Sequence, residues 1–167
     1  MKSSKSYKRT EVEVLQRLFG EGDYLTEQYD VADVYFEKED EITIAEYKTR
    51  NCKIKTYAQE GYVLEEKKAF ALAARAKTAA EETGKKVRVL YINYFSKSGE
   101  VAVWDLPSVF KNRQFTKGFG MFNKRSATDF NGYGVKVEKP VYFLKPDSAS
   151  EIIEMNQSRE GEYRMGN

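Results

Sequence analysis

Apolar side chains recur with two different periods along this chain, and the two periods predict where helices and strands lie. Residues 7–19 read as an amphipathic helix that Gly20 and Gly22 end. Its apolar stripe consists of Val14, Leu15, Leu18 and Phe19. Residues 57–83 are rich in alanine and predict a long second helix that stops at Gly84.

Apolar and polar residues alternate in several other segments, which is typical of strands. Residues 86–95 and 100–104 predict a hairpin around a turn at 96–99. Two short strands are expected at 135–137 and 141–144, on either side of a proline.

The remaining segments lack a clear period. Residues 112–134 are rich in Gly, Phe and Asn and read as a long loop. We expect one domain over residues 1–146 and a polar, partly disordered tail over 147–167. The order of helix, strands, long helix and strands predicts an α/β fold of the α+β kind, with a mixed sheet flanked by helices.

A first hairpin, expected over residues 29–37 and 42–49 around a charged turn, brings carboxylates together. If a four-residue turn joins its strands, Glu37 pairs with Ile42 and the numbers of each further pair also sum to 79. Asp33 then lies opposite Glu46, and directly opposed residues share one face of the sheet. Lys48 follows Glu46 by two positions, so it lies on the same face.

Two adjacent carboxylates repel each other unless a cation or a shared proton offsets the repulsion. Asp30 is the competing aspartate, but its pairing with Thr49 gives it the opposite parity, so we expect it to face away. Asp33, Glu46 and Lys48 could therefore hold a hard divalent cation and position a water near a phosphate.

The composition excludes several classes of enzyme and of metal site. The 167 residues include no histidine and one cysteine, Cys52. Histidine-dependent hydrolases, thiolate zinc clusters and intrachain disulfides are therefore excluded. If the chain is an enzyme, oxygen ligands hold its metal, which favours Mg²⁺, with Mn²⁺ as a substitute. We see neither a membrane span nor a secretory signal and expect a cytoplasmic protein.

The net charge of +2 conceals two regions of opposite sign. Residues 21–46 hold ten acidic side chains and one lysine, whereas residues 111–125 hold five basic side chains and no acidic one. An acidic centre beside a basic segment suits metal binding next to a polyanion, although such blocks are also common on ordinary solvated surfaces.

Asp33 followed by Glu46-Tyr47-Lys48, on a hairpin between two helices, resembles the PD-(D/E)XK nuclease superfamily. Tyr62, Glu65 and Lys68, together with the strand pair that ends at Leu106, are similar to small phage and bacterial members. The resemblance covers roughly residues 7–106 and implies a restriction-endonuclease-like α-β-β-β-α-β core with extra C-terminal strands. Ala32 stands where the family name has proline.

The resemblance also implies roles for individual residues. Asp33 and Glu46 would bind Mg²⁺, with the backbone carbonyl of Tyr47 as a third ligand. Lys48 would orient or deprotonate the attacking water, and Glu11 would be an outer or second-metal carboxylate. The chain would then be a Mg²⁺-dependent phosphodiesterase acting on DNA in a bacterial or phage-infected cell, and two-strand cleavage would call for a homodimer.

The DNA-binding side chains are expected to be basic. They are Arg50, Lys68, Lys111, Arg113, Lys117, Lys124 and Arg125. Alternative interpretations stay open. Glu11 would suit a helix N-terminus without any function, and Lys68 could simply extend its stem along the core. The whole chain could be a nuclease fold that binds DNA, such as a junction or single strand, or a partner protein, with little or no cleavage.

Overall fold

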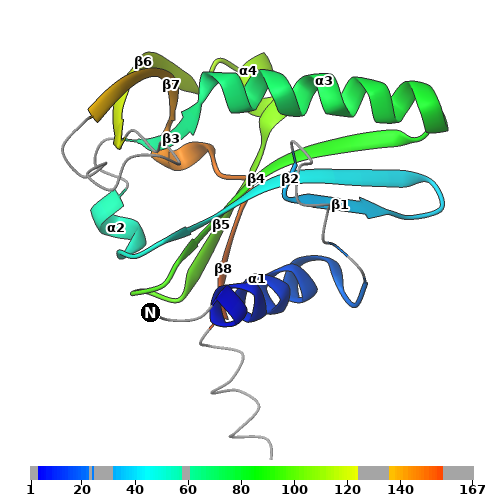
Figure 1. The fold of residues 1–167 in the computed structure, drawn as a ribbon, viewed down its shortest axis with the longest axis horizontal. Coiled ribbons are helices and arrows are strands. Elements are labelled where there is room, and N and C mark those ends of the chain that lie inside the picture. Colours follow the sequence, from blue (N-terminus) through cyan, green and yellow to red (C-terminus); the bar gives the residue numbers. More distant parts are fainter. Residues whose placement is uncertain (1–3, 23, 25–31, 58–60, 124–135, 156–167) are drawn as a thin grey trace, which may run out of the picture.

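The structure, a computed structural model, describes residues 4–22, 24, 32–57, 61–123 and 136–155 (Figure 1). In chain order the elements are α1 (Ser4–Phe19), β1 (Val34–Glu37), β2 (Glu41–Arg50), α2 (Ile54–Tyr57), β3 (Tyr62–Glu65), α3 (Glu66–Thr83), β4 (Lys86–Phe95), β5 (Glu100–Asp105), α4 (Leu106–Lys111), β6 (Phe115–Asn123), β7 (Lys136–Leu144), the 3-10 turn η1 (Pro146–Ser148) and β8 (Glu151–Glu154).

The strands form two sheets. The larger has the order β1-β2-β4-β5-β8, and among its described strands β2 and β4 are parallel while the other neighbours are antiparallel. The smaller is antiparallel and has the order β3-β7-β6. Helices α1 and α3 lie on opposite faces of the larger sheet (Figure 1). The predicted mixed sheet flanked by helices is therefore confirmed, whereas the second sheet was not anticipated.

The predicted register of the first hairpin is confirmed over its described part. Pairing runs from Glu37 with Ile42 to Val34 with Ala45. The turn is closed by a hydrogen bond of 2.8 Å from the Lys38 amide to the Glu41 carbonyl. The start of the expected strand at residues 29–31, including Asp30, lies outside the described residues.

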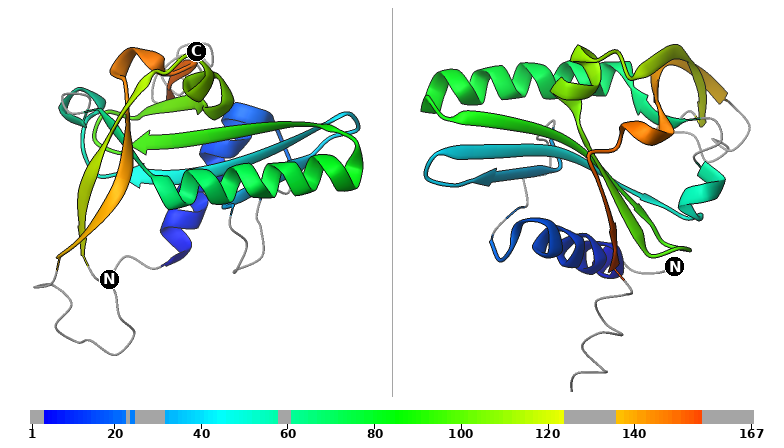
Figure 2. Two further views of the ribbon diagram at one scale, coloured as in Figure 1. Left: turned by 90° about the horizontal axis from the view of Figure 1, so that it is seen from above. Right: turned by 180° about the vertical axis from the view of Figure 1, so that it is seen from behind.

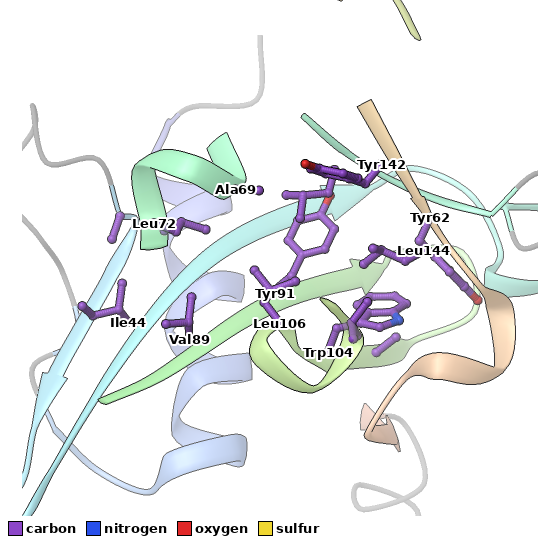
Figure 3. Packing of buried hydrophobic residues seen from close by; sticks show 14 of the residues in the cluster. Ile44, Tyr62, Ala69, Leu72, Val89, Tyr91, Trp104, Leu106, Tyr142 and Leu144 are labelled. Atoms are coloured by element: carbon purple, nitrogen blue, oxygen red, sulfur yellow. The ribbon is translucent and has the colours of Figure 1, made fainter. Parts of the chain in front are cut away.

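The two faces of β2 meet different helices, because its side chains alternate between them. Ala45 and Tyr47 pack in the cluster that contains Val14 and Leu15 of α1. Even-numbered residues of β2 face α3 and the second sheet. The core on that side includes Ile44, Tyr62, Ala69, Leu72, Val89, Tyr91, Trp104, Leu106, Tyr142 and Leu144 (Figure 3). Glu46 and Lys48 share the parity of Ile44 and therefore lie on this second face.

The first helix and the second hairpin agree with the sequence. Helix α1 ends before Gly20, whose φ of 84° is left-handed. Strands β4 and β5 form the hairpin expected around residues 96–99. The expected helix over 57–83 is wrong in its first part, because α3 begins only at Glu66. Residues 62–65 form β3 instead, since alternate side chains there are buried and the backbone pairs with β7.

The segment expected as a loop over 112–134 is wrong in its described part. Residues 115–123 form β6, which pairs with β7 along its whole length. Strand β7 is continuous through Pro140, where two short strands were expected. Strand β3 pairs only with residues 141–144, so at Pro140 strand β7 has a neighbour on one side only and tolerates a missing N–H.

The C-terminal segment contributes to the larger sheet. Residues 151–154, within the segment expected to be a polar tail, form β8 and pair with β5. Pairing from a neighbouring strand supplies the backbone hydrogen bonds that this polar sequence does not indicate by itself. Residues 156–167 lie outside the described part of the chain.

Gly61 distinguishes the observed strand from the expected helix. Its φ is 90°, and an added Cβ would lie 3.1 Å from the Leu144 carbonyl oxygen. We expect Gly61→Ala to lower the free energy of unfolding by about 1–2 kcal/mol, measured by urea denaturation. In a helix interior the same change would instead stabilise the protein by about 1 kcal/mol.

Gly84→Ala is the matched control, because Gly84 also has a positive φ, 68°, but nothing lies within 4 Å of an added Cβ. It should show the conformational part of the loss without the steric part. A Gly61→Ala protein more stable than the wild type would contradict the assignment of β3.

Candidate active site

Asp33 lies immediately before β1, where the regular pairing with β2 ends. Its backbone N–H donates to the Ala45 carbonyl at 3.1 Å. Its Oδ2 accepts a hydrogen bond of 3.0 Å from the backbone N–H of Tyr47. The carboxylate thus substitutes for a backbone acceptor at the end of the hairpin. This contact holds the Asp33 side chain beside the residue that precedes Tyr47, which is Glu46.

Glu46 is a buried carboxylate with two lysine partners. The whole residue is 1% exposed. Lys48 Nζ lies 3.1 Å from Oε1, and Lys68 Nζ of α3 lies 3.1 Å from Oε2. The Lys68 contact is an ion pair without hydrogen-bond geometry, and Oε2 accepts no hydrogen bond from the described residues. The side chains of both lysines are partly exposed, 49% for Lys48 and 31% for Lys68, so the cluster reaches solvent through them.

The pKa of Glu46 is raised above its ordinary value of 4.5. Burial is the largest cause, because it disfavours the charged form, and the negative charge of Asp33 adds to it. The charges of Lys48 and Lys68 act in the opposite direction without cancelling the rise. The effect of Asp33 shows that the two carboxylates lie close enough to repel each other, as the hairpin register predicts.

Strand β4 places two polar side chains next to Glu46 and Lys48. Tyr91 is the register partner of Glu46, and Asn93 is the register partner of Lys48. Arg50 Nε donates to Asn93 Oδ1 at 2.9 Å, and Arg50 Nη2 donates to the Tyr91 hydroxyl at 2.7 Å. The Tyr91 hydroxyl donates in turn to the Val63 carbonyl at 2.7 Å. Burial is the main reason why the pKa of Tyr91 rises to about 12.

Arg50 therefore has an internal role in the structure. Besides the contacts to β4, its Nη2 lies 3.4 Å from the Val63 carbonyl, and its guanidinium carbon lies 5.0 Å from the centre of the Tyr57 ring. The guanidinium group of Arg50 is therefore contacted both at its edge and over its face. Arg50 thus links the larger sheet to β3.

Glu11 lies on α1, which packs on the opposite face of β2 from Glu46. Burial is the main cause that raises the pKa of Tyr47 to about 12. A hydrogen bond from Thr49 acts in the opposite direction, and the negative charge of Glu11 adds to the rise. Among the described residues, no group of three or more Asp, Glu, Cys or His side chains is placed to hold a metal. The structure thus brings Asp33 and Glu46 together and does not join Glu11 to them.

The basic residues expected to bind DNA have different placements. Lys111 ends α4 and is exposed, and Arg113 is exposed with a left-handed φ of 52°. Lys117 is exposed on β6, with its Nζ 5.9 Å from the centre of the Tyr142 ring. Lys124 and Arg125 lie outside the described residues. Lys68 contacts Glu46, as described above.

Sequence reasoning missed Tyr91 and Asn93. Both lie on one face of a strand whose other residues are largely apolar, at the spacing of two that places them side by side. The available signal in the sequence was an asparagine between Ile92 and Tyr94 in a mostly apolar strand. Such a residue is expected to be buried, as Asn93 is, and buried polar groups require partners. No local signal indicated that Lys68 meets Glu46, since their contact depends on how α3 packs on the sheet.

Comparisons with known proteins give no match: neither a protein-family model nor a curated protein corresponds to this chain. Among the described residues, no helix has the length and apolar character to cross a membrane. The resemblance to PD-(D/E)XK nucleases therefore stays a prediction from the residues themselves.

The raised pKa of Glu46 predicts a pH effect on stability. The unfolded state ionises near the ordinary value of 4.5, whereas the folded state holds the proton to higher pH. The free energy of unfolding of the wild type should therefore fall relative to Glu46→Gln as pH rises above about 4.5. Urea denaturation of both proteins in EDTA at a series of pH values measures this difference. A wild type that gains on the variant with rising pH would contradict the assigned shift.

Proposed function

We propose that this protein is a metal-dependent nuclease that hydrolyses phosphodiester bonds of DNA. The observation that carries the proposal is the buried Glu46 carboxylate, held beside Asp33 and contacted by two lysines at the end of the β1–β2 hairpin. Paired carboxylates next to lysines suit a site that binds a cation and a phosphate together.

The donor atoms fit Mg²⁺ or Mn²⁺. Both ions prefer oxygen ligands, and Mg²⁺ commonly binds proteins through one or two carboxylates while keeping several waters. Asp33 and Glu46 would hold the ion, with the backbone carbonyl of Tyr47 as the further ligand that the family resemblance implies. When bound, the ion would lower the pKa of a coordinated water and offset charge that develops on the phosphate.

The lysines would bind and orient the substrate. Lys48 is half exposed and contacts Glu46 Oε1, so its ammonium group lies between the buried carboxylate and solvent. From there it would attract a phosphate oxygen and stabilise negative charge in the transition state. Lys68 contacts the other oxygen of Glu46 and places a second positive charge in the same cluster.

We further propose that the fold is related to the restriction-endonuclease core. In support, α1 precedes the hairpin that carries the acidic residues, α3 follows it, and β4 then pairs in parallel with β2. The inserted α2 and the position of β3 in the second sheet are departures from the implied order.

A second candidate function is a nuclease-like protein that binds DNA without cleaving it. The observation in its favour is that Glu46 already has two lysine partners, each at 3.1 Å. These charges compensate the carboxylate without a metal ion. A protein that uses Glu46 only to hold its lysines would bind a polyanion and show no metal-dependent cleavage.

The proposal predicts metal-dependent cleavage that depends on Glu46 and Lys48. With Mg²⁺ or Mn²⁺, the wild type should cut at least one of a linear duplex, a single strand, a four-way junction or a supercoiled circle, and EDTA should stop it. Glu46→Ala and Lys48→Ala should each lower the rate by about 100-fold or more, because each removes charge at the reacting phosphate.

The matched controls are Glu39→Ala in the exposed turn and Lys77→Ala on the exposed side of α3, which remove the same charges away from the site. Both should retain wild-type rates. Full activity in Glu46→Ala would overturn the site, and metal-independent binding without cleavage by the wild type would favour the second candidate.

A further inference from the structure

Strands β6 and β7 form a long antiparallel pair, here called the β6–β7 arm. The pairing covers nine positions, from Phe115 with Leu144 to Asn123 with Lys136. Strand β3 covers only residues 141–144 of β7. The rest of the arm extends beyond β3 and away from the body of the molecule (Figure 2, left).

One face of the arm changes from buried to exposed along its length. At the inner end, Tyr142 and Leu144 are part of the core. At the outer end, on the same face by strand parity, Phe119 is 65% exposed and Met121 is 61% exposed. Phe119 lies opposite Pro140, which is also exposed. The outer end therefore presents the apolar side chains of Phe119, Met121 and Pro140 to solvent, with the exposed Glu138 opposite Met121.

The opposite face of the arm is packed by its own aromatic rings. A Cβ added to Gly118 would lie 2.7 Å from the Phe143 ring, and one added to Gly120 would lie 2.8 Å from the Phe122 ring. The two rings thus lie across the glycines and would have to shift to admit a larger residue. Phe119 and Met121 lie on the other face and are not part of this packing.

The arm and the segments that flank its inner end carry an excess of positive charge. Among the described residues from 111 to 145, six are basic and one, Glu138, is acidic. The basic residues are Lys111, Arg113, Lys117, Lys136, Lys139 and Lys145. Lys139 is partly engaged, because its Nζ lies 3.6 Å from Glu65. This excess of positive charge is complementary to a polyanion such as a nucleic-acid backbone.

We propose that the outer end of the β6–β7 arm binds unpaired nucleotides of the DNA substrate, with Phe119 and Met121 contacting bases and Lys117 contacting the backbone. The inference rests on the proposed function, because it names the kind of DNA that the site receives. Bases of a duplex already stack on their neighbours, whereas unpaired bases offer open faces to an aromatic ring. Side chains two residues apart on a strand lie about 6.8 Å from each other, which is close to two base-stacking steps.

Fluorescence anisotropy with labelled DNA tests this inference without any cleavage. In EDTA, the wild type should bind a single strand more tightly than a duplex of the same length. Phe119→Ala should weaken single-strand binding by about 5- to 150-fold, which is the range for loss of one stacked base. Its melting temperature should stay at the wild-type value, because Phe119 is exposed.

Phe70→Ala is the matched control, because Phe70 is also a phenylalanine, 61% exposed, but lies on α3. It should bind like the wild type. Lys117→Gln should weaken binding and reduce its salt dependence by about one released counterion. Unchanged single-strand binding in Phe119→Ala, or an equal loss in Phe70→Ala, would overturn the inference. So would a wild-type dimer that Phe119→Ala dissociates without any change in DNA binding.

The outcomes separate this inference from the proposed function. Binding that depends on Phe119, in a protein that cuts no DNA with Mg²⁺ or Mn²⁺, would support the arm and contradict the nuclease. Cleavage that depends on Glu46, with single-strand binding that is unchanged in Phe119→Ala, would support the nuclease and contradict the proposed role of the arm.

Discussion

The buried carboxylate of Glu46 is the constraint on which the arrangement of this molecule depends. A charge in the interior is costly unless partners compensate it, and here the partners come from separate parts of the chain. Lys48 belongs to the same strand as Glu46, and Lys68 comes from α3, twenty-two residues after Glu46 in the sequence. Asp33, fixed by the Tyr47 amide, adds a second negative charge. The hairpin and α3 must therefore be correctly placed for the site to be neutral.

A second polar contact joins this site to the smaller sheet. The Val63 carbonyl of β3 accepts from the Tyr91 hydroxyl, which Arg50 also contacts. Tyr91 is the register partner of Glu46, so the carboxylate cluster and the junction between the sheets lie next to each other. Strand β3 in turn pairs with β7, which carries the β6–β7 arm. The arm is thus attached to the structure through residues adjacent to the candidate active site.

The sequence allowed the hairpin and the proximity of Asp33 to Glu46 to be predicted, because a charged turn between two alternating segments determines the register. It did not allow β3 or β6 to be predicted. Tyr62–Glu65 runs directly into an alanine-rich helix, and its partner β7 follows much later in the chain. The glycines of β6 weaken its strand pattern, although its partner β7 is the next element. The pairing of Lys68 with Glu46 was equally hidden, because it depends on packing between distant segments. Local pattern identified the acidic centre and Lys48, and a tertiary contact supplied Lys68.

Metal binding by the isolated protein tests the central claim most directly. Calorimetric titration of Mn²⁺ into the wild type, without DNA, should show a binding event that Glu46→Gln abolishes and that Glu39→Gln, altered in the exposed turn, retains. A Glu46→Gln protein that binds Mn²⁺ as the wild type does, or a wild type that binds none, would show that Asp33 and Glu46 are not a metal site.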